Sequence, residues 1–229
     1  MAKELSKSEV DRLGDRLRES ALTEADLELL DRYRRSFGDV YDHVAGTIRG
    51  KLSLAPTGRS AKSTASVIEK LRRESIRLSQ MQDLAGCRIV VNDLEEQDKA
   101  VAAVREAFAD AVEIDRRSKP SHGYRAVHVV VREAGRAVEI QIRTKLQHLW
   151  AEFSEKVADS VDPRLKYGEG PPWLQQQLLH FSALFAQVES ASDEELWARE
   201  GKRRSEIIEL LERELAAILP AILKLGMGD

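Results

Sequence analysis

EIQIRTKLQHLWAEFSEK, residues 139–156, is the stretch that decides the fold. In its first part, Glu139, Gln141 and Arg143 alternate with apolar residues. Because successive side chains of a strand point to opposite faces, the three polar groups share one face. Such a face can be a functional site, or only the solvated face of an edge strand. From Lys145 the spacing is helical, so a strand leads directly into a helix.

A second carboxylate favours the functional reading. In QDLAGCRIVV, residues 82–91, Asp83 comes directly before a run with the pattern of a buried strand. Two carboxylates on neighbouring strands can hold a divalent cation, because hard cations prefer oxygen ligands. Asp83 and Glu139 therefore predict a site at the edge of a sheet.

The composition sets broad limits. The chain has 229 residues, of which 42% are hydrophobic and 33% charged, enough for one sizeable domain with a helical appendage. No apolar run approaches the ~20 residues of a membrane span, and residues 1–12 lack the apolar core of a signal peptide, so we expect a cytoplasmic protein without membrane contact. A single cysteine, Cys87, excludes internal disulfides. The net charge of -3 argues against a generally basic nucleic-acid binder.

The order of the expected elements predicts the fold class. Thr23 and Asp26 form a capping pair before one long helix whose core face includes Leu27 and Leu30. Helices are expected at 63–77, 93–108 and from 145, with a break at 168–172, and strands within 52–59 and at 84–91, 111–115, 125–133 and 137–144. The last two strands form a hairpin. This order predicts an α/β (α+β) fold, a mixed sheet of about five strands flanked by helices. We divide the chain into an N-terminal helical region (1–50), a core (51–160) and C-terminal helices (161–229).

Cations gather on one side of the helix from Ser63. At about 100° per residue, one narrow sector holds the polar residues Lys62, Ser66, Lys70, Arg73 and Arg77, and the opposite face is apolar. A charged stripe is often a solvated helix face. Few carboxylates balance this one, which suggests a phosphate ligand, and Arg59 could reach the same anion.

The loop RRSKPSHGY, residues 116–124, combines cations with an aromatic ring. Arg116, Arg117 and Lys119 precede Gly123, which lets Tyr124 present its ring. A ring beside cations can stack a nucleobase while the cations bind its phosphates. The alternative is a surface loop with a packed tyrosine. His128, which follows, has the pattern of a hydrogen-bonded structural residue unless its neighbours form a site.

Four segments in order carry a family resemblance: KSTASVIEKLRRE (62–74), QDLAGCRIVV (82–91), SHGYRAVH (121–128) and EIQIRTKLQHLWAE (139–152). They resemble the synthetase domain of the RelA/SpoT family, specifically its single-domain small alarmone synthetases, over residues 52–156. The resemblance implies a polymerase-β-like nucleotidyltransferase fold. It also implies transfer of pyrophosphate from ATP to the 3′-hydroxyl of a guanine nucleotide, GDP or GTP, giving AMP and a (p)ppGpp-type alarmone.

The resemblance also implies residue roles. Asp83 matches the aspartate that binds Mg²⁺, and Glu139 the carboxylate that shares the metal or activates the 3′-hydroxyl. The residues that match the ATP-donor face are Arg59, Lys62, Ser66, Lys70 and Arg88. Those that match the acceptor side are Lys119, Tyr124, His128, Gln141 and Arg143.

Two departures from the family pattern affect these roles. Ser60 stands where many members have an arginine two residues before the motif lysine. Ser154 and Glu155 replace a Glu-His pair on the helix that borders the acceptor side. The first departure bears on the donor contacts, and the second on the identity of the acceptor.

Other functions stay open at this stage. The family includes toxins, some acting on nucleotides and others on the 3′ CCA end of tRNA, so an adenine nucleotide or tRNA is an alternative acceptor and an antitoxin protein a candidate partner. Binding tRNA would need cations outside the pocket, for which the candidates are Arg32, Arg34, Arg35 and Lys202 to Arg204. A noncatalytic nucleotide-binding module is disfavoured because both carboxylates are present.

The C-terminal part carries a narrow apolar seam of Leu174, Leu178, Phe181, Phe185 and Val188. The seam is expected to pack within the chain or to form a homo-oligomer. Pro220 should kink or end a later helix, residues 206–223.

Overall fold

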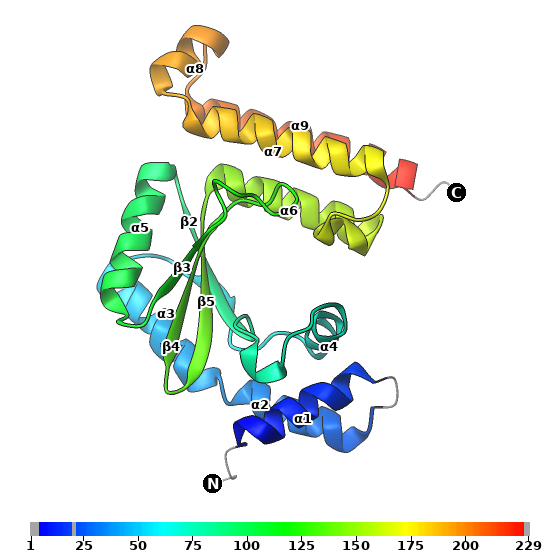
Figure 1. Cartoon of the computed structure of the whole chain (residues 1–229). Helices are drawn as coiled ribbons and strands as arrows, with labels where there is room; N and C mark the ends of the chain where they lie inside the picture. The colour runs from blue at the N-terminus through cyan, green and yellow to red at the C-terminus, as the bar shows by residue number, and fades with distance from the viewer. Residues whose placement is uncertain (1–4, 20–21, 227–229) are drawn as a thin grey trace. The chain divides into compact units, whose positions relative to one another are not determined.

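The computed structural model describes residues 5–19 and 22–226, so the first four residues of the N-terminal stretch considered above lie outside it. Figure 1 shows the elements in chain order. The strands are β1 (Thr57–Arg59), β2 (Ala85–Val91), β3 (Val112–Asp115), β4 (Val127–Glu133) and β5 (Arg136–Thr144). The helices are α1 (Lys7–Arg18), α2 (Glu24–Arg35), α3 (Gly38–Leu52), α4 (Thr64–Arg73), α5 (Leu94–Ala107), α6 (Lys145–Ser160), α7 (Pro172–Ser190), α8 (Asp193–Glu200) and α9 (Arg204–Gly226), with short 3₁₀ helices η1 (Leu78–Gln80) and η2 (Pro163–Tyr167).

The strands form one mixed five-stranded sheet, as the sequence predicts, and their order is β1-β2-β5-β4-β3. β1 is the short edge strand expected before α4 and pairs antiparallel with β2. Glycine is required where strands approach closely: a Cβ at Gly58 would lie 2.5 Å from Cys87 Cα, and one at Gly86 2.8 Å from the carbonyl oxygen of Glu139. The central pair, β2 and β5, therefore brings the segment after Asp83 against the backbone of Glu139.

The predicted hairpin is confirmed as β4 and β5. Its two-residue turn has φ of 46° at Ala134 and 73° at Gly135. Positive φ at both turn positions matches the right-handed twist of paired strands, which sets the register of the hairpin. Along β5, Ile140 and Ile142 are fully buried while Glu139 and Gln141 are partly exposed. The alternation predicted from the sequence is therefore confirmed for residues 139–142, whereas Arg143 is buried.

The contacts divide the chain into two compact units that interleave along the sequence. The first comprises Met1–Ile89, Ala100–Glu113 and His128–Gln141. In it, α1 packs against α2, α4 and η1 (Figure 1). The predicted long helix is wrong in one respect: α2 and α3 are separate, and Ser36 and Phe37 stand between them. Phe37 is buried in contact with Tyr33, whereas Leu27, expected in the core, is 39% exposed.

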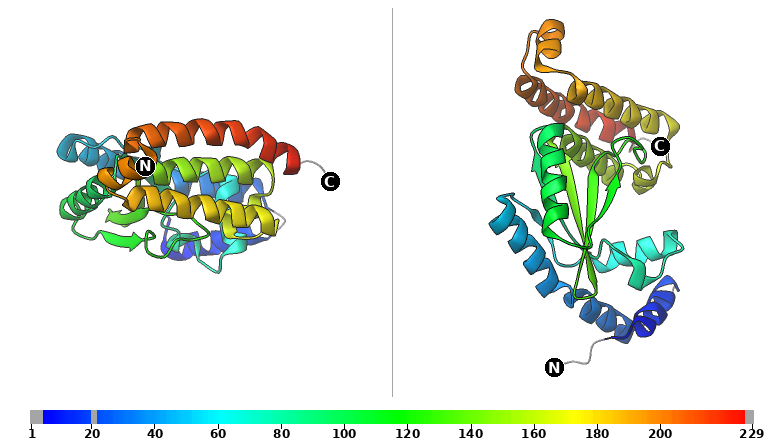
Figure 2. Two further views of the ribbon diagram at one scale, coloured as in Figure 1. Left: turned by 90° about the horizontal axis from the view of Figure 1, so that it is seen from above. Right: turned by 60° about the vertical axis from the view of Figure 1, so that its left-hand side comes forward.

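The second unit comprises Val90–Lys99, Ile114–Val127 and Ile142–Asp229. Within it, α6 packs against α7, α9 and η2, and Figure 2 shows α6, α7 and α9 running alongside one another. Leu174, Leu178 and Phe185 of the apolar seam are buried in one cluster with Trp150 and Phe153 of α6. The seam thus packs within the chain.

Two further expectations meet the structure here. The helix α9 continues through Pro220 to Gly226. Of the two effects predicted for Pro220, the end of the helix is therefore wrong, and the kink stays a prediction. Within the described part of the chain, no helix has the length and apolarity needed to cross a membrane. The three-part division at residues 50 and 160 stays a prediction.

Two leucines of α2 provide a test of which face of this helix is buried. Leu30 is 0% exposed and Leu27 39% exposed. Leu30→Ala should destabilise the protein by about 2–5 kcal/mol because it leaves a cavity, whereas Leu27→Ala should change stability by less than about 0.5 kcal/mol. Urea unfolding of both variants measures the difference. Equal losses would show that the face of α2 has been assigned wrongly.

Candidate active site

Asp83 is held between two lysines of the first unit. Lys62 Nζ donates to Asp83 Oδ2 at 2.7 Å, and Lys70 Nζ lies 3.0 Å from Asp83 Oδ1. Lys62 precedes α4 and Lys70 lies in its second half, so the helical spacing brings both to one carboxylate. Ser63 caps α4, and its side chain accepts a hydrogen bond from the backbone N–H of Ser66 at 3.2 Å. Of the sector predicted from the sequence, Lys62 and Lys70 therefore contact Asp83.

The lysines decide the charge of Asp83. Burial raises the pKa of this carboxyl, but the charges of Lys62 and Lys70 and their hydrogen bonds outweigh burial and lower the pKa below its ordinary value of 3.8. Asp83 is therefore ionised at neutral pH. An ionised carboxylate can bind a cation. If a cation binds Asp83, both lysines become available to bind phosphate.

Glu139 is held from two sides. His128 Nδ1 donates to Glu139 Oε1 at 2.9 Å, and Gln141 Nε2 donates to Glu139 Oε2 at 2.9 Å. Burial raises the pKa of Glu139, yet the bonds from His128 and Gln141 lower it overall. The negative charge of Asp83 acts in the raising direction on the same pKa. The two carboxylates therefore interact electrostatically, as expected of a shared site.

Two other residues predicted to bind the donor, Arg59 and Arg88, lie in strands and differ in their exposure. Arg59 is exposed in β1, and Arg88 is half-buried in β2 opposite Thr57. The cationic stripe is shorter than expected. Arg73 pairs with Glu69 and Glu74, and Arg77 lies beyond the end of α4. The charges of Lys62 and Lys70, and not the whole stripe, thus characterise this site.

In the second unit, the cation beside the Tyr124 ring is Arg143 of β5, whereas the sequence predicts the cations of the loop itself. Arg143 Nη2 donates to the Tyr124 hydroxyl at 3.0 Å, and the guanidinium carbon lies 4.9 Å from the ring centroid. Both residues line a pocket of about 160 Å³. Ser154 and Glu155, where the sequence departs from the family pattern, line it as well. The departure therefore lies where a ligand of Tyr124 would be bound.

The predicted cations of the loop differ in availability. Lys119 is exposed. Arg117 donates to both oxygens of Asp115 and to Asp98 Oδ1, and these hydrogen bonds raise its pKa. Because Arg117 is engaged with two carboxylates, it serves to shape the loop. The expectation that it would bind an anion is not supported.

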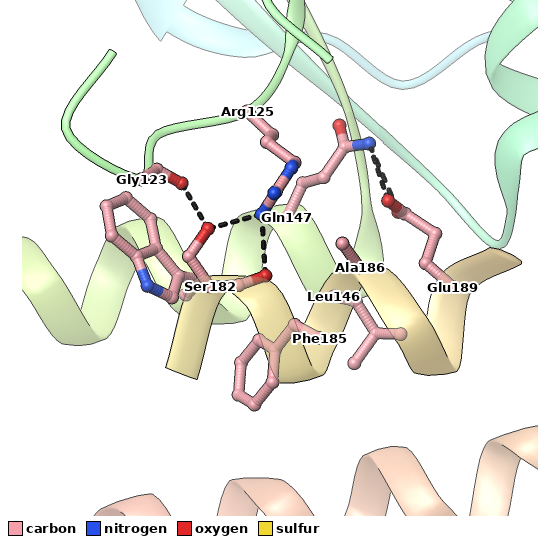
Figure 3. Close-up of a pocket in the computed structure, with 9 residues that line it drawn as sticks. Gly123, Arg125, Leu146, Gln147, Ser182, Phe185, Ala186 and Glu189 are labelled. Atoms are coloured by element: carbon pink, nitrogen blue, oxygen red, sulfur yellow. Dashed lines mark hydrogen bonds between the residues drawn. The ribbon is translucent and has the colours of Figure 1, made fainter. Parts of the chain in front are cut away.

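Helix α7 holds the turn that precedes Tyr124. Figure 3 shows Ser182 hydrogen-bonded to Gly123 and to Arg125. The Ser182 hydroxyl donates to the carbonyl oxygen of Gly123 at 2.5 Å, and Arg125 Nη1 donates to the carbonyl oxygen of Ser182 at 2.6 Å. Gly123 has φ of 88°, and a Cβ there would lie 2.8 Å from Trp150. Sequence reasoning missed Ser182 and Arg125, because their partners lie far away in the chain and no local motif marks them.

A network of buried polar side chains is hydrogen-bonded to the last residues of β5. Glu189 Oε1 accepts from Gln147 Nε2 at 3.1 Å and from the Thr144 hydroxyl. Gln97 Nε2 donates to Gln147 Oε1 and to the carbonyl oxygen of Ile142, both at 2.7 Å. Buried polar groups of this kind are costly unless each is hydrogen-bonded. The network therefore fixes the strand that carries Arg143. The sequence shows Glu189 only as one charge in a helix.

The carboxylates are suited to a magnesium ion. Mg²⁺ is usually bound by one or two carboxylates together with waters and substrate phosphates. Asp83 and Glu139 supply two ionised carboxylates whose charges interact. Among the described residues, no group of three or more His, Cys, Asp or Glu side chains forms a closed metal site. The protein therefore offers the partial ligand set expected for a cation that arrives with a phosphate.

Comparison with known proteins assigns the central region. Residues 58–159 match the family described as the region found in RelA/SpoT proteins. This region is similar to RelA/SpoT proteins. The match covers Asp83, Glu139 and every other predicted site residue, and it confirms the resemblance seen in the sequence.

Curated proteins that are similar to this chain include some with and some without a named activity. An uncharacterized protein of Mycobacterium tuberculosis is 41% identical over 140 residues, which is 59% of this chain and 51% of the relative. The GTP pyrophosphokinase YjbM of Bacillus subtilis is 34% identical over 136 residues, 48% of this chain and 62% of the relative. The chain thus spans about half the length of the mycobacterial relative.

A solved structure agrees with the fold. The crystal structure of small alarmone synthetase 1 from Bacillus subtilis matches with a TM-score of 0.55 and 25% sequence identity, covering 78% of this chain and 97% of that one. The predicted α+β class, with a five-stranded mixed sheet flanked by helices, is therefore confirmed.

The ion pair of Asp83 provides a pH test. Lys62→Met should raise the pKa of Asp83, since only Lys70 then opposes the effect of burial. An NMR titration of the carboxyl carbon measures the shift. In the wild type the pKa of Asp83 is lower in the folded than in the unfolded state, so ionised Asp83 stabilises the folded protein. This stabilisation is complete at pH values above the ordinary pKa of 3.8, and it is lost as the pH falls through the folded-state pKa. The difference in free energy of unfolding between the wild type and Lys62→Met should therefore decrease as the pH is lowered. A constant difference would contradict the ion pair.

Proposed function

We propose that this protein transfers a pyrophosphate group from ATP to the 3′-hydroxyl of GDP or GTP, giving AMP and a (p)ppGpp-type alarmone. The observation that carries the proposal is the arrangement of Asp83 between Lys62 and Lys70, with Glu139 close enough to interact electrostatically. The names of the relatives support it, because one is a GTP pyrophosphokinase and the matching structure is a small alarmone synthetase.

The donor binds through the cations of the first unit. Lys62 and Lys70 exchange Asp83 for the phosphates of ATP, and the exposed Arg59 and the half-buried Arg88 add positive charge. The N-terminal turn of α4, which contains Ser66, favours an anion because its backbone N–H groups and helix dipole are positive. A Mg²⁺ ion held by Asp83 and Glu139 would neutralise phosphate charge that develops during transfer. Most of the catalysis then comes from positioning and electrostatics.

The transfer itself is a displacement at the β-phosphorus of ATP. The 3′-oxygen of the acceptor forms a bond to this phosphorus, while the bond from the β-phosphorus to the oxygen shared with the α-phosphorus breaks. AMP leaves with that oxygen, and the proton of the 3′-hydroxyl passes to a base. Glu139 is positioned for this role, because His128 and Gln141 orient its carboxylate. Alternatively, Glu139 contributes only to metal binding and water takes the proton.

The acceptor binds through residues of β5 and of the loop before β4. Tyr124 stacks on the base, and Arg143, which holds the tyrosine hydroxyl, supplies a charge beside the ring. Lys119 is exposed and free to approach a phosphate, and His128 and Gln141 contribute near the ribose. The pocket lined by Tyr124 and Arg143 is large enough to admit part of a nucleotide.

Three of the candidate cations for tRNA binding, Arg34, Arg35 and Arg204, make contacts within the protein. Arg34 and Arg35 share Asp31, and Arg204 donates to the carbonyl oxygens of Val188 and Glu189. These arginines stabilise helices, so fewer charges remain for an RNA backbone than the sequence suggests. An adenine-nucleotide acceptor, a growth-inhibiting role, an antitoxin, a homo-oligomer and cytoplasmic localisation stay predictions.

The carboxylates provide the first test. With ATP labelled at the γ-phosphate, Mg²⁺ and GDP, the wild type should release AMP and label the acceptor. Asp83→Asn and Glu139→Gln should each lower turnover by about two to three orders of magnitude, because each removes a charge at the reacting phosphate. Circular dichroism should show that both variants fold.

The same assay separates the alternatives. Offering ADP, ATP and deacylated tRNA as acceptors identifies the preferred one. Release of pyrophosphate with AMP attached to the acceptor would mean nucleotidyl transfer. Full turnover in either carboxylate variant at saturating Mg²⁺ would remove that residue from the site.

Tyr124 provides the second test. Tyr124→Ala should remove base stacking worth about 1–3 kcal/mol, which weakens GDP binding by about tenfold to more than a hundredfold. Tyr124→Phe is the matched control, since it keeps the ring and removes the hydroxyl that accepts two hydrogen bonds from Arg143. Isothermal titration with GDP measures both. If Tyr124→Phe binds as weakly as Tyr124→Ala, the hydroxyl and not the ring is the important group.

A further inference from the structure

Lys62, the lysine nearest to Asp83, is fixed at three points. Its backbone N–H donates to the carbonyl oxygen of Leu84 at 2.6 Å, and its Nζ donates to Asp83 at 2.7 Å. Its carbonyl oxygen accepts a hydrogen bond from Arg34 Nε at 2.5 Å. The first two contacts come from the segment around β2. The third comes from α2, an element outside the region shared with the RelA/SpoT family.

Arg34 makes a second contact at the same place. Its Nη1 donates to the Thr64 hydroxyl at 2.9 Å, and Thr64 is the first residue of α4. One guanidinium therefore binds the chain on both sides of Ser63, the residue that caps α4. The Arg34 side chain is only 16% exposed, although α2 lies near the N-terminus and carries mostly solvated charges. Its burial is explained by these contacts.

The chemistry of arginine suits this position. The guanidinium is planar and rigid and donates in fixed directions, whereas the ammonium of lysine is a flexible point charge. A partly buried carbonyl that loses its charged donor is costly to leave unpaired. Without Arg34, the segment 62–64 would relax, and Lys62 and the start of α4 would move together. Lys70 would move too, since it belongs to the same helix.

We infer that Arg34 is a positioning residue for the donor triphosphate: it sets Lys62, and through Thr64 the start of α4, in the places from which Lys62 and Lys70 bind phosphate. The inference rests on the proposed function. It assigns to the helix α2 a part in ATP binding, without contact between Arg34 and the nucleotide.

The neighbouring arginine supplies a matched control. Arg35 is also in the last turn of α2, it also pairs with Asp31, and its side chain is 79% exposed. Arg35→Gln therefore removes the same charge from the same turn without affecting the segment 62–64. Arg34→Gln removes both contacts, Arg34→Lys keeps the charge but not the fork, and Thr64→Val removes one contact only.

The experiment measures donor binding and turnover separately. Binding of a nonhydrolysable ATP analogue with Mg²⁺ is followed by calorimetry, and KM for ATP, KM for GDP and kcat are measured with the full chain. Arg34→Gln should weaken analogue binding and raise KM for ATP by about tenfold or more, which corresponds to about 1.4 kcal/mol. Arg34→Lys and Thr64→Val should have intermediate effects. Arg35→Gln should stay within about twofold of wild type, as should KM for GDP in every variant.

The outcomes separate this inference from the proposed function. If the wild type transfers pyrophosphate to no acceptor, the proposed function fails, and the analogue titration still tests Arg34. Unchanged analogue affinity in Arg34→Gln overturns the inference. Equal losses in Arg34→Gln and Arg35→Gln also overturn it, because charge alone would then be responsible. If Arg34→Gln does not fold, unchanged affinity in both Arg34→Lys and Thr64→Val overturns it.

Discussion

The ion pairs of Asp83 are the constraint on which the first unit depends. A buried carboxylate next to the start of a strand is unfavourable unless positive charge compensates it. Lys62 and Lys70 provide that charge from the two ends of one helical stretch, so α4 must lie with its polar sector toward β2. The apolar sector of α4, with Val67 and Leu71 fully buried, then packs against the N-terminal helices. The charge balance of one aspartate thus sets the orientation of a helix.

The same reasoning explains why Glu139 differs from Asp83. Both carboxylates are ionised, but Asp83 is compensated by lysines and Glu139 by the neutral amide of Gln141 and by His128. Lys62 and Lys70 can release Asp83 when a phosphate binds them, because a phosphate is an equivalent anionic partner. His128 of β4 and Gln141 of β5 stay beside Glu139, because a tight hairpin turn joins the two strands. Asp83 is therefore adapted to exchange partners, and Glu139 to keep a defined orientation.

The sequence predicts those features that have a local period. The strands and the shared face of Glu139 and Gln141 follow from the two-residue period of a strand. The common sector of Lys62 and Lys70 follows from the rotation of about 100° per residue along a helix. Prediction from the sequence fails where a contact joins distant segments. At the break between α2 and α3, Arg136 of β5 lies over the rings of both Tyr33 and Phe37, and this contact joins distant segments. Tyr33 and Phe37 themselves have the i, i+4 spacing of a continuous helix, so the sequence pattern predicts no break between them.

A further pattern concerns where the supporting residues lie. Those that carry the proposed chemistry fall within residues 58–159, the region shared with the family. Several that hold them fall outside it: Arg34 binds the segment before α4, Ser182 holds the turn before Tyr124, and Glu189 anchors Thr144 at the end of β5. Each contacts the backbone or a helix cap and not a proposed ligand group. Because a backbone carbonyl is present whatever the residue type, such supports can be supplied from different flanking helices without changing the shared motifs. The flanking helices are therefore part of the site's architecture in this protein, and comparison of the shared region alone does not reveal them.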